Sequence, residues 1–308
     1  MIEICKICRC TDNHPVFMGR EIKHGDTFSY FCCTHCGCLQ IMDIPHNIQK
    51  YYQNYHALKT MSGKEFWLKS TLRKQLFKYR LTGKNRFGKI LAKLSKDAFE
   101  WIEPGMFDFH SSILDVGSGS GRLLLKMSHS GFSDLTGIDP FIENDIEYRT
   151  GKGTVHMEKK DIFELTGQYD VIMLHHVLEH IPDQNAALAH LVKRMHPQSK
   201  LIIHIPVMSE YIWHRLGMNG FQLGDVPRHY YIHTRKSLSV LTENHGLQLL
   251  SAKYLGSKII LDSADGKIRL QEANKSPEDI ISTLVNNQDS GLACFYYRLN
   301  PTSHLVKK

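Results

Sequence analysis

The hydrophobic pattern of the chain is clearest over residues 113–125. A short apolar run at residues 112–116 contains the acid Asp115, three glycines follow at alternate positions, and leucines then recur at spacings that suit a buried helix. Short apolar runs bounded by turn residues are typical of buried strands. The stretch therefore predicts a strand, a tight turn and a helix.

Further apolar runs predict the other strands of the same domain. They lie at residues 134–139, 154–157, 169–175, 200–205, 247–254 and 292–297. Helical patterns separate several of them, and the clearest has apolar positions three and four residues apart up to a predicted stop at Pro197. Strands that alternate with helices favour an α/β fold with a largely parallel sheet. The long connection at residues 206–233 is rich in aromatic residues and histidines, which suggests a lid or substrate-binding insertion.

Two helices are expected ahead of this domain. Leucines recur at helical spacing over residues 64–79, with lysines and arginines on the other faces, and a second helix is predicted from about residue 87 to 103. Between residues 59 and 96 there are twelve basic residues against one acid. The first helix either packs on the main domain with a solvated lysine face or lies on an anionic surface, lipid or RNA.

Length and composition fit one α/β domain with a small additional module. The chain has 308 residues, and 42% of them are hydrophobic. No run approaches the roughly eighteen apolar residues of a membrane-spanning helix, and the first residues lack the apolar core of a signal peptide. We expect a cytoplasmic protein.

The three glycines of the first pattern, Gly117, Gly119 and Gly121, predict a ligand site. Without a Cβ, the backbone can take positive φ and a ligand can approach the main chain, although an ordinary turn would also use glycine. The carboxylate of Asp115 would repel a pyrophosphate at a helix amino terminus, but it would suit a ligand with an amino group and a sulfonium. The pattern indicates S-adenosylmethionine.

Two more acids fall where this ligand would need them. Asp139 ends the second predicted strand about twenty residues after the glycine loop, the offset of an acid that holds a ribose diol. Asp161 follows the third strand and could accept a hydrogen bond from the adenine amino group. Each acid alone also fits a solvated loop or a helix cap. Three at successive strand ends favour the ligand site.

These motifs, together with the fourth predicted strand and the sequence His-His-Val-Leu-Glu-His-Ile-Pro after it, resemble the class I S-adenosylmethionine-dependent methyltransferases in order and spacing. The resemblance covers roughly residues 106–300 and implies a Rossmann-like, doubly wound sheet of seven strands. It implies cofactor-binding roles for Asp115, Gly117, Gly119, Gly121, Asp139, Asp161 and His175.

Seven of the eight cysteines lie within the first 38 residues. Cys5 and Cys8 form one CxxC knuckle and Cys33 and Cys36 form a second, a pattern that predicts one closed tetrahedral zinc site that is structural and takes no part in the chemistry. Disulfides are the alternative, and a pairing of Cys32 with Cys36 stays open. Further candidate ligands are Cys10, Cys32, Cys38 and His35.

The chain is thus predicted to contain a zinc ribbon at residues 1–50, a basic helical linker at 51–105 and a methyltransferase domain at 106–308. The ribbon and the tyrosines that follow it resemble the front end of methyltransferases encoded with sugar and surface-polysaccharide biosynthesis. Zinc ribbons also occur on RNA-modifying methyltransferases, so this module does not by itself identify a substrate.

The acceptor determines which catalytic groups are needed. A hydroxyl must lose its proton to a nearby base, whereas an amine mainly needs an open lone pair. The Asn/Asp-Pro-Pro-Tyr motif associated with amide-like nitrogens is missing after the fourth strand, which disfavours base and glutamine nitrogens. Candidate bases are His176, Glu179, His180, His204 and His229.

Residues 225–229 resemble the Asp-x-Pro-Arg-His element of the polysaccharide-type methyltransferases, which favours His229, with His176 and His180 as the other catalytic candidates. The sequence predicts O-methylation of a small-molecule sugar or a carrier-linked glycan. An RNA methyltransferase and a non-catalytic cofactor-binding scaffold are the alternatives. Nucleic acid is not the expected partner, and residues 64–79 are expected to contact an anionic membrane peripherally.

Overall fold

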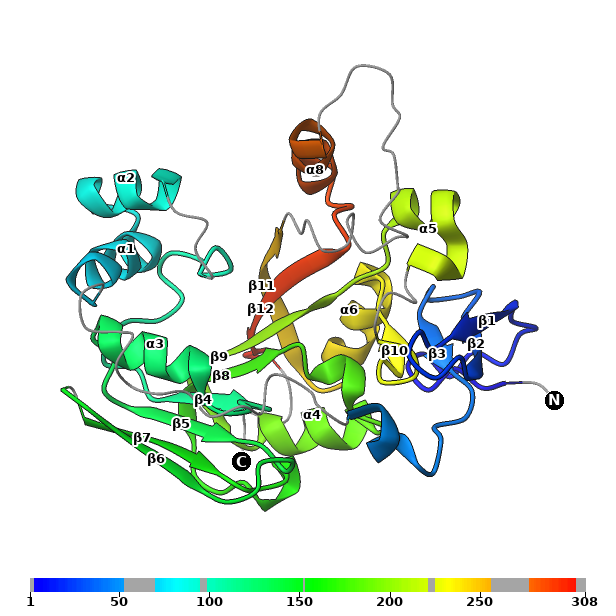
Figure 1. The fold of residues 1–308 in the computed structure, drawn as a ribbon, viewed down its shortest axis with the longest axis horizontal. Coiled ribbons are helices and arrows are strands. Elements are labelled where there is room, and N and C mark those ends of the chain that lie inside the picture. The colour runs from blue at the N-terminus through cyan, green and yellow to red at the C-terminus, as the bar shows by residue number, and fades with distance from the viewer. Residues whose placement is uncertain are drawn as a thin grey trace.

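The computed structural model describes residues 3–52, 70–94, 99–151, 153–220, 225–255 and 277–302. Two sheets organise this part of the chain, a small one near the amino terminus and a large one in the centre (Figure 1). The large sheet has eight strands in the order β11-β12-β9-β8-β4-β5-β7-β6. Its strands are β4 (Ile113–Val116), β5 (Leu135–Ile138), β6 (Ile146–Thr150), β7 (Gly153–Glu158), β8 (Tyr169–His175), β9 (Met195–Pro206), β11 (Leu247–Tyr254) and β12 (Leu292–Leu299).

Five strands of the large sheet run parallel, from β7 through β5, β4 and β8 to β9. β12 is antiparallel to β9, and β11 is antiparallel to β12. All seven predicted strands are therefore present. The prediction of seven strands was nevertheless one short, because β6 pairs antiparallel with β7 at the edge and adds an eighth strand.

The predicted stop of a helix at Pro197 was wrong. Helix α4 (Gln184–Val192) ends earlier, and Met195 already pairs with Tyr169, so Pro197 lies within β9. A register shift between Tyr169 and Val171 allows a few residues at the start of β9 to lie outside regular pairing. Proline, which cannot donate to a ladder, is tolerated at such irregular positions.

The strands alternate their side chains between two separate cores. On one face, Leu114 and Leu174 pack with α4 and α6 (Arg235–Glu243). On the other face, Ile113 and Met173 pack with α1 (Ser70–Thr82) and α3 (Arg122–Ser130). Because successive side chains of a strand point to opposite faces, apolar residues at consecutive positions imply cover on both sides. The sheet is doubly wound, as expected.

The basic helix predicted over residues 64–79 is described only from Ser70, where α1 begins, and residues 64–69 lie outside the described part. Leu76 and Phe77 of α1 are buried, while Lys74 and Lys78 are exposed. Helix α2 (Arg86–Leu94) is shorter than predicted, and residues 99–101 form a turn. No helix in the described ranges is both long and apolar enough to cross a membrane.

The small sheet joins the amino-terminal segment to the insertion. Its order is β1-β2-β3-β10, with β1 (Val16–Arg20), β2 (Thr27–Cys32) and β3 (Leu39–Ile41) from the first 41 residues. The fourth strand is β10 (Tyr231–Ile232), which pairs Tyr231 with Gln40 and Ile232 with Leu39. The amino-terminal strands therefore share a sheet with the segment that carries His229 (Figure 1).

The insertion was predicted to be a lid or a substrate-binding insertion, and the structure fixes its second half by contacts with three other segments. Besides the β3 pairing, Tyr230 N–H donates to the Glu179 carbonyl at 2.8 Å, and the Tyr231 hydroxyl donates to the Pro182 carbonyl at 2.8 Å. Its first half contains α5 (Glu210–Leu216), above the small sheet in Figure 1. Residues 225–233 thus pack against the residues that follow β8, at the carboxyl edge of the large sheet.

Candidate functional site

The loop between β4 and α3 adopts the conformation that its glycines allow. Gly117, Gly119 and Gly121 have φ angles of +68°, +53° and +75°, which L side chains rarely adopt. A Cβ on Gly117 would lie 2.5 Å from the Val177 side chain, and one on Gly121 would lie 2.4 Å from the Met157 sulfur. The loop is therefore pressed against Val177 after β8 and against Met157 of β7, and larger residues would force these segments away.

Asp139 fixes this loop from the next strand. One carboxylate oxygen accepts a hydrogen bond from Gly119 N–H at 2.9 Å, and the other accepts from Phe141 N–H at 2.8 Å. The strand end and the glycine loop are thus a single hydrogen-bonded unit. Burial raises the pKa of Asp139, although the two backbone N–H groups oppose that shift.

Asp115 is a buried carboxylate beside this unit. The residue is 3% exposed, and its side chain accepts no hydrogen bond from the residues that the structure describes. Burial, followed by the charge of Asp139, raises the pKa of Asp115 to about 8. A carboxylate without partners in a low-dielectric site is costly, and a bound cation would relieve that cost.

Asp161 and His175, the other predicted cofactor residues, have local partners. The Asp161 carboxylate accepts from Phe163 N–H at 3.0 Å and caps the short helix η4 (Ile162–Glu164). His175 ends β8, with its Nδ1 3.0 Å from Nδ1 of His204. Burial lowers the pKa of His175 to about 3, so its imidazole is neutral. The helix cap was one of the alternatives considered for Asp161.

The three predicted catalytic histidines come together around Glu179. His176, Glu179 and His180 follow β8, Glu179 and His180 lying in the short helix η5 (Leu178–His180), and His229 arrives from the insertion. Glu179 Oε1 lies 3.6 Å from His176 Nδ1 and 4.0 Å from His229 Nε2. The rings of His180 and His229 have centroids 4.7 Å apart. Sequence positions about fifty residues apart thus form one cluster.

Glu179 is the central residue of the cluster. It is 0% exposed, and neither of its carboxylate oxygens has a hydrogen-bond partner among the described residues. Burial alone would raise the pKa of Glu179, but the imidazoles of His176, His180 and His229 outweigh burial and hold it at about 2. Glu179 is therefore a buried anion surrounded by imidazole rings.

The histidines of the cluster differ in environment. Partial burial opposes protonation of His176, but the Glu179 carboxylate outweighs it and raises the pKa. His176 has φ +54°, a strained backbone of the kind that concentrates at functional sites, and its side chain is 47% exposed. Burial lowers the pKa of His229 to about 4, and its side chain is 11% exposed. His229, which the sequence favoured as the base, is thus more enclosed than His176.

Tyr52 connects the cluster to the glycine loop, and its contacts were not predicted. At the end of η1 (Ile48–Tyr52), its hydroxyl lies 3.3 Å from Nδ1 of His180, and its ring stacks on Phe141 with centroids 5.4 Å apart. Phe141 follows Asp139 by two residues, while Val177 touches Gly117. Sequence alone showed only a run of tyrosines after the ribbon. Their contacts with residues far along the chain require the fold.

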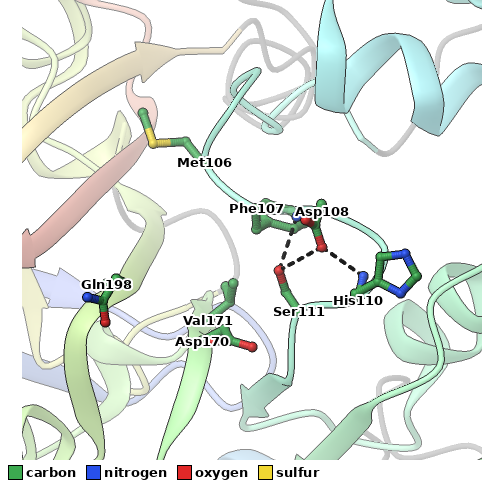
Figure 2. A pocket seen from close by; sticks show the side chains of 8 residues that line it. All are labelled: Met106, Phe107, Asp108, His110, Ser111, Asp170, Val171 and Gln198. Carbon is green, nitrogen blue, oxygen red and sulfur yellow. Dashed lines mark hydrogen bonds between the residues drawn. The ribbon is translucent and has the colours of Figure 1, made fainter.

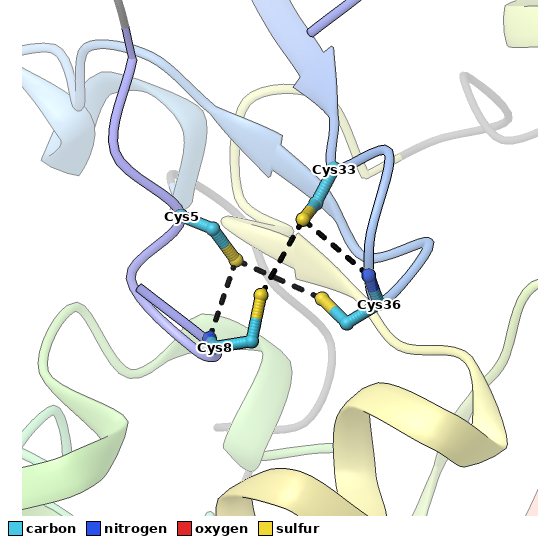
Figure 3. A group of neighbouring side chains, drawn as sticks. All are labelled: Cys5, Cys8, Cys33 and Cys36. Carbon is cyan, nitrogen blue, oxygen red and sulfur yellow. Dashed lines mark hydrogen bonds between the residues drawn. The ribbon is translucent and has the colours of Figure 1, made fainter. Parts of the chain in front are cut away.

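Two pairs of cysteines form a third site, in the small amino-terminal module (Figure 3). The sulfur atoms of Cys5 and Cys36 are 3.7 Å apart, and those of Cys8 and Cys33 are 3.5 Å apart. Disulfide sulfurs lie about 2.05 Å apart, whereas sulfurs bound tetrahedrally to zinc at about 2.3 Å lie about 3.8 Å apart. The geometry matches a metal ion, and all four residues are free cysteines.

Both cysteine knuckles have the same backbone turn. Cys8 N–H donates to the Cys5 sulfur at 3.4 Å, and Cys36 N–H donates to the Cys33 sulfur at 3.5 Å. The residue after each second cysteine has positive φ, +62° at Arg9 and +72° at Gly37. Such N–H donors stabilise thiolates, as outer-shell partners of a metal site do. The predicted set therefore fits a metal ion.

A cavity of about 300 Å³ lies elsewhere, between Met106, Asp108, Asp170 and Gln198 (Figure 2). Asp170 and Ser111 stand at the amino ends of β8 and β4, on the opposite edge of the sheet from the glycine loop. In Figure 2, Asp108 turns back to bond the Ser111 hydroxyl and the backbone of His110. Ligands of open α/β sheets bind at the carboxyl ends of the strands, so this cavity is not the cofactor site.

Comparison with known proteins assigns the main domain. A family described as a methyltransferase domain matches residues 74–252. The ubiquinone biosynthesis O-methyltransferase of Rickettsia bellii is 35% identical over 97 residues, which cover 30% of this chain and 40% of that protein. EEF1A lysine methyltransferase 2 of Danio rerio is 44% identical over 39 residues, 13% of this chain and 17% of that protein. The chain thus spans less than half the length of these curated relatives.

Among solved structures, an S-adenosylmethionine dependent methyltransferase from Mesorhizobium loti is similar, with a TM-score of 0.39 and 12% identity. The alignment covers 63% of this chain and 94% of that one.

Replacing Asp115 by asparagine should flatten the pH dependence of stability. The pKa is about 8 in the folded protein, against about 3.9 in an unfolded chain. The folded state therefore holds a proton that the unfolded state releases, and the free energy of unfolding should fall as pH rises from about 4 to about 8. The slope should reach roughly 1 kcal/mol per pH unit.

Urea denaturation of the ligand-free protein near pH 5 and pH 8 measures this slope. Asp115→Asn should show a smaller loss of stability over the interval than the wild type. The exposed Asp134→Asn should behave like the wild type and serves as the control. Equal slopes in wild type and Asp115→Asn would contradict the burial argument.

Proposed function

The chain belongs to the methyltransferase-domain family, and we propose on this premise that it transfers a methyl group from S-adenosylmethionine to a hydroxyl group of a small molecule. The observation that carries the hydroxyl assignment is the cluster of His176, His180 and His229 around the buried Glu179. This cluster adjoins the glycine loop through the contact of Val177 with Gly117. A proton acceptor thus stands beside the place where the methyl donor is expected.

The cofactor would lie along the glycine loop, at the carboxyl ends of β4 and β5. Asp115 would face the amino group of the methionine part, because it is a buried carboxylate without a hydrogen bond from the described residues. Asp139 would accept from the ribose hydroxyls while keeping its bonds to the loop. Adenine contact through Asp161 and a cofactor role for His175 stay predictions. When bound, S-adenosylmethionine supplies an electrophilic methyl group.

His176 is the best placed base in this proposal. A hydroxyl acceptor must give up its proton as the methyl group is transferred. His176 is half-exposed and can reach an acceptor, while its Nδ1 lies 3.6 Å from Glu179, which orients the ring. His229, the candidate favoured by the sequence, is enclosed by Asp225 and Glu179, and would help to hold that carboxylate in place.

The proposal that the methyl group is transferred to an oxygen atom is supported by the alignment to an enzyme named as an O-methyltransferase. A sugar or glycan hydroxyl, expected from the sequence, is the first acceptor class to test. The alternative of RNA methylation and the contact of residues 64–79 with an anionic surface both stay predictions. Labelled methyl transfer into fractionated cell glycans, RNA and protein tests the acceptor class, and label in RNA alone would contradict the hydroxyl of a small molecule. Flotation with anionic vesicles at low salt tests the surface contact.

The wild type should bind S-adenosylmethionine with micromolar affinity, as titration calorimetry can measure. Asp139→Ala should weaken binding by roughly 1.5 to 3 kcal/mol, the range for a lost hydrogen bond to a charged group. The exposed Asp134→Ala serves as the control and should bind like the wild type. Absence of heat with the wild type, or unchanged affinity in Asp139→Ala, would contradict the proposed site.

His176→Ala should lower kcat by about a hundredfold to ten-thousandfold, the usual effect of losing a general base. Affinity for the cofactor should stay unchanged, because His176 lies outside the glycine loop. The exposed His156→Ala on β7 is a matched control and should retain full turnover. If His176→Ala keeps near wild-type turnover while His229→Ala loses it, the base lies in the insertion. If both remain active, an amine acceptor becomes the better assignment.

The cysteine site is proposed to hold one zinc ion through Cys5, Cys8, Cys33 and Cys36. Such sites contribute on the order of 10 kcal/mol to local folding, so Cys8→Ser should lose the metal and unfold the small module while cofactor binding persists. Cys10→Ser should keep the metal, which would show that the Cys10 thiol is not a ligand. Elemental analysis of protein purified under reducing conditions without chelator measures both. Zinc-free wild type would rule the site out.

A further inference from the structure

Glu179 and two of the histidines beside it are also arranged as the ligands of a metal ion would be, which a set of bases does not require. Glu179, His180 and His229 each offer one ligand atom, and these atoms all lie within 4.8 Å of one another. Atoms that bind one ion tetrahedrally at about 2.1 Å lie about 3.4 Å apart. The three ligand atoms would therefore have to close by up to roughly 1.4 Å to share an ion, a shift that side-chain rotation can supply.

Glu179 is the strongest reason to expect a cation here. Its carboxylate is 0% exposed and has no hydrogen bond to either oxygen among the described residues. Buried carboxylates are normally paired, hydrogen-bonded or bound to metal. The surrounding imidazoles approach Glu179 no closer than 3.6 Å to 4.0 Å, which is longer than a hydrogen bond.

His180 is oriented in the way that metal-binding histidines usually are. Its Nδ1 lies 2.8 Å from the Arg228 carbonyl oxygen. Histidine ligands commonly donate one ring N–H to a backbone carbonyl, which fixes the tautomer and leaves the other nitrogen for the metal. The available ligand atom of His180 is therefore Nε2. Arg228 immediately precedes His229, so the same segment supplies one ligand and orients another.

We propose that Glu179, His180 and His229 bind a divalent first-row transition-metal ion, separate from the cysteine site. Two imidazoles and one carboxylate suit ions such as Mn²⁺, Fe²⁺, Co²⁺ or Zn²⁺, whereas Ca²⁺ and Mg²⁺ prefer oxygen ligands. Three protein ligands leave coordination positions open. Asp225 lies 3.6 Å from His229 Nε2, and it faces the site from the insertion.

The role of the ion rests on the proposed function. An acceptor hydroxyl that occupies an open position would lose its proton more easily, because a bound cation lowers the pKa of a coordinated oxygen. His176, which contacts Glu179 but is not one of the three ligands, would then accept that proton. The oxygen would attack the methyl group, and the methyl–sulfur bond would break with its electrons left on sulfur.

Mn²⁺ binding to the full chain, with the cysteine site loaded with zinc, tests the proposal. Electron paramagnetic resonance should show one Mn²⁺ bound per chain, since thiolate sites disfavour this ion. Glu179→Gln and His229→Ala should each weaken Mn²⁺ binding at least about a hundredfold. Loss of a residue that only supports a ligand typically weakens metal binding by about tenfold to a hundredfold, so a larger effect identifies a direct ligand. His156→Ala should bind like the wild type. Calorimetry with S-adenosylmethionine shows that each variant is folded.

Equilibrium dialysis against Zn²⁺ provides the second measurement, and two zinc ions per wild-type chain are expected. No Mn²⁺ bound together with one zinc per chain would overturn the site, as would equal binding by the wild type and both ligand variants. Methyl transfer by protein that holds one zinc alone would reject the metal while leaving the proposed function intact. Metal binding without methyl transfer to any hydroxyl would reject the function and leave the site standing.

Discussion

The pairing of β4 with a parallel strand on each side determines the rest of the structure. Val116 is opposite Ile138 of β5 and Leu174 of β8, so the three strands end at one level. The glycine loop, Asp139 and the histidines after β8 therefore leave the sheet at the same edge. Parallel strands connected through helices always return to the same end, which is why ligands gather there. Shifting this register by one residue would invert both cores and separate these groups.

Local pattern predicted most of this framework. The apolar runs gave the central strands β4, β5, β8, β9 and β12 most clearly, because both faces of the sheet are covered there. The strand β6 was missed since Ile146–Thr150 alternates polar and apolar residues at an edge, where burial is weak. The helix before β9 was extended too far because its apolar spacing continues to Met195, and only the pairing with Tyr169 makes that residue part of a strand.

The three candidate sites were predictable to different degrees. The glycine loop and the four cysteines are contiguous or regularly spaced motifs, so spacing alone brings their atoms together. The histidine cluster depends on the β3–β10 pairing, which connects Gln40 with Tyr231 and has no local signal. Its members could be named from the sequence, but the central place of Glu179 could not. Burial and the absence of nearby donors, which define its chemistry, arise only when the chain is folded.

Two buried carboxylates show how neighbours, at equal burial, determine charge. Burial, followed by the charge of Asp139, raises the pKa of Asp115 to about 8, whereas three imidazoles overcome burial and hold the pKa of Glu179 at about 2. Near neutral pH the carboxyl of Asp115 is mostly protonated until a cation approaches, and that of Glu179 is ionised. Asp115 near the end of β4 and Glu179 in η5 after β8 thus give the same sheet edge a site that responds to its ligand and a site with a negative charge.

The pairing of β3 with β10 also has a consequence for synthesis of the chain. When the ribosome has released the first three strands, the free side of β3 has no partner, because Tyr231 is translated much later than Gln40. An unpaired strand edge can bind other chains, and contacts between distant positions slow folding. During translation the module must therefore stay soluble with one edge of β3 open until Tyr231 has emerged and can pair with Gln40.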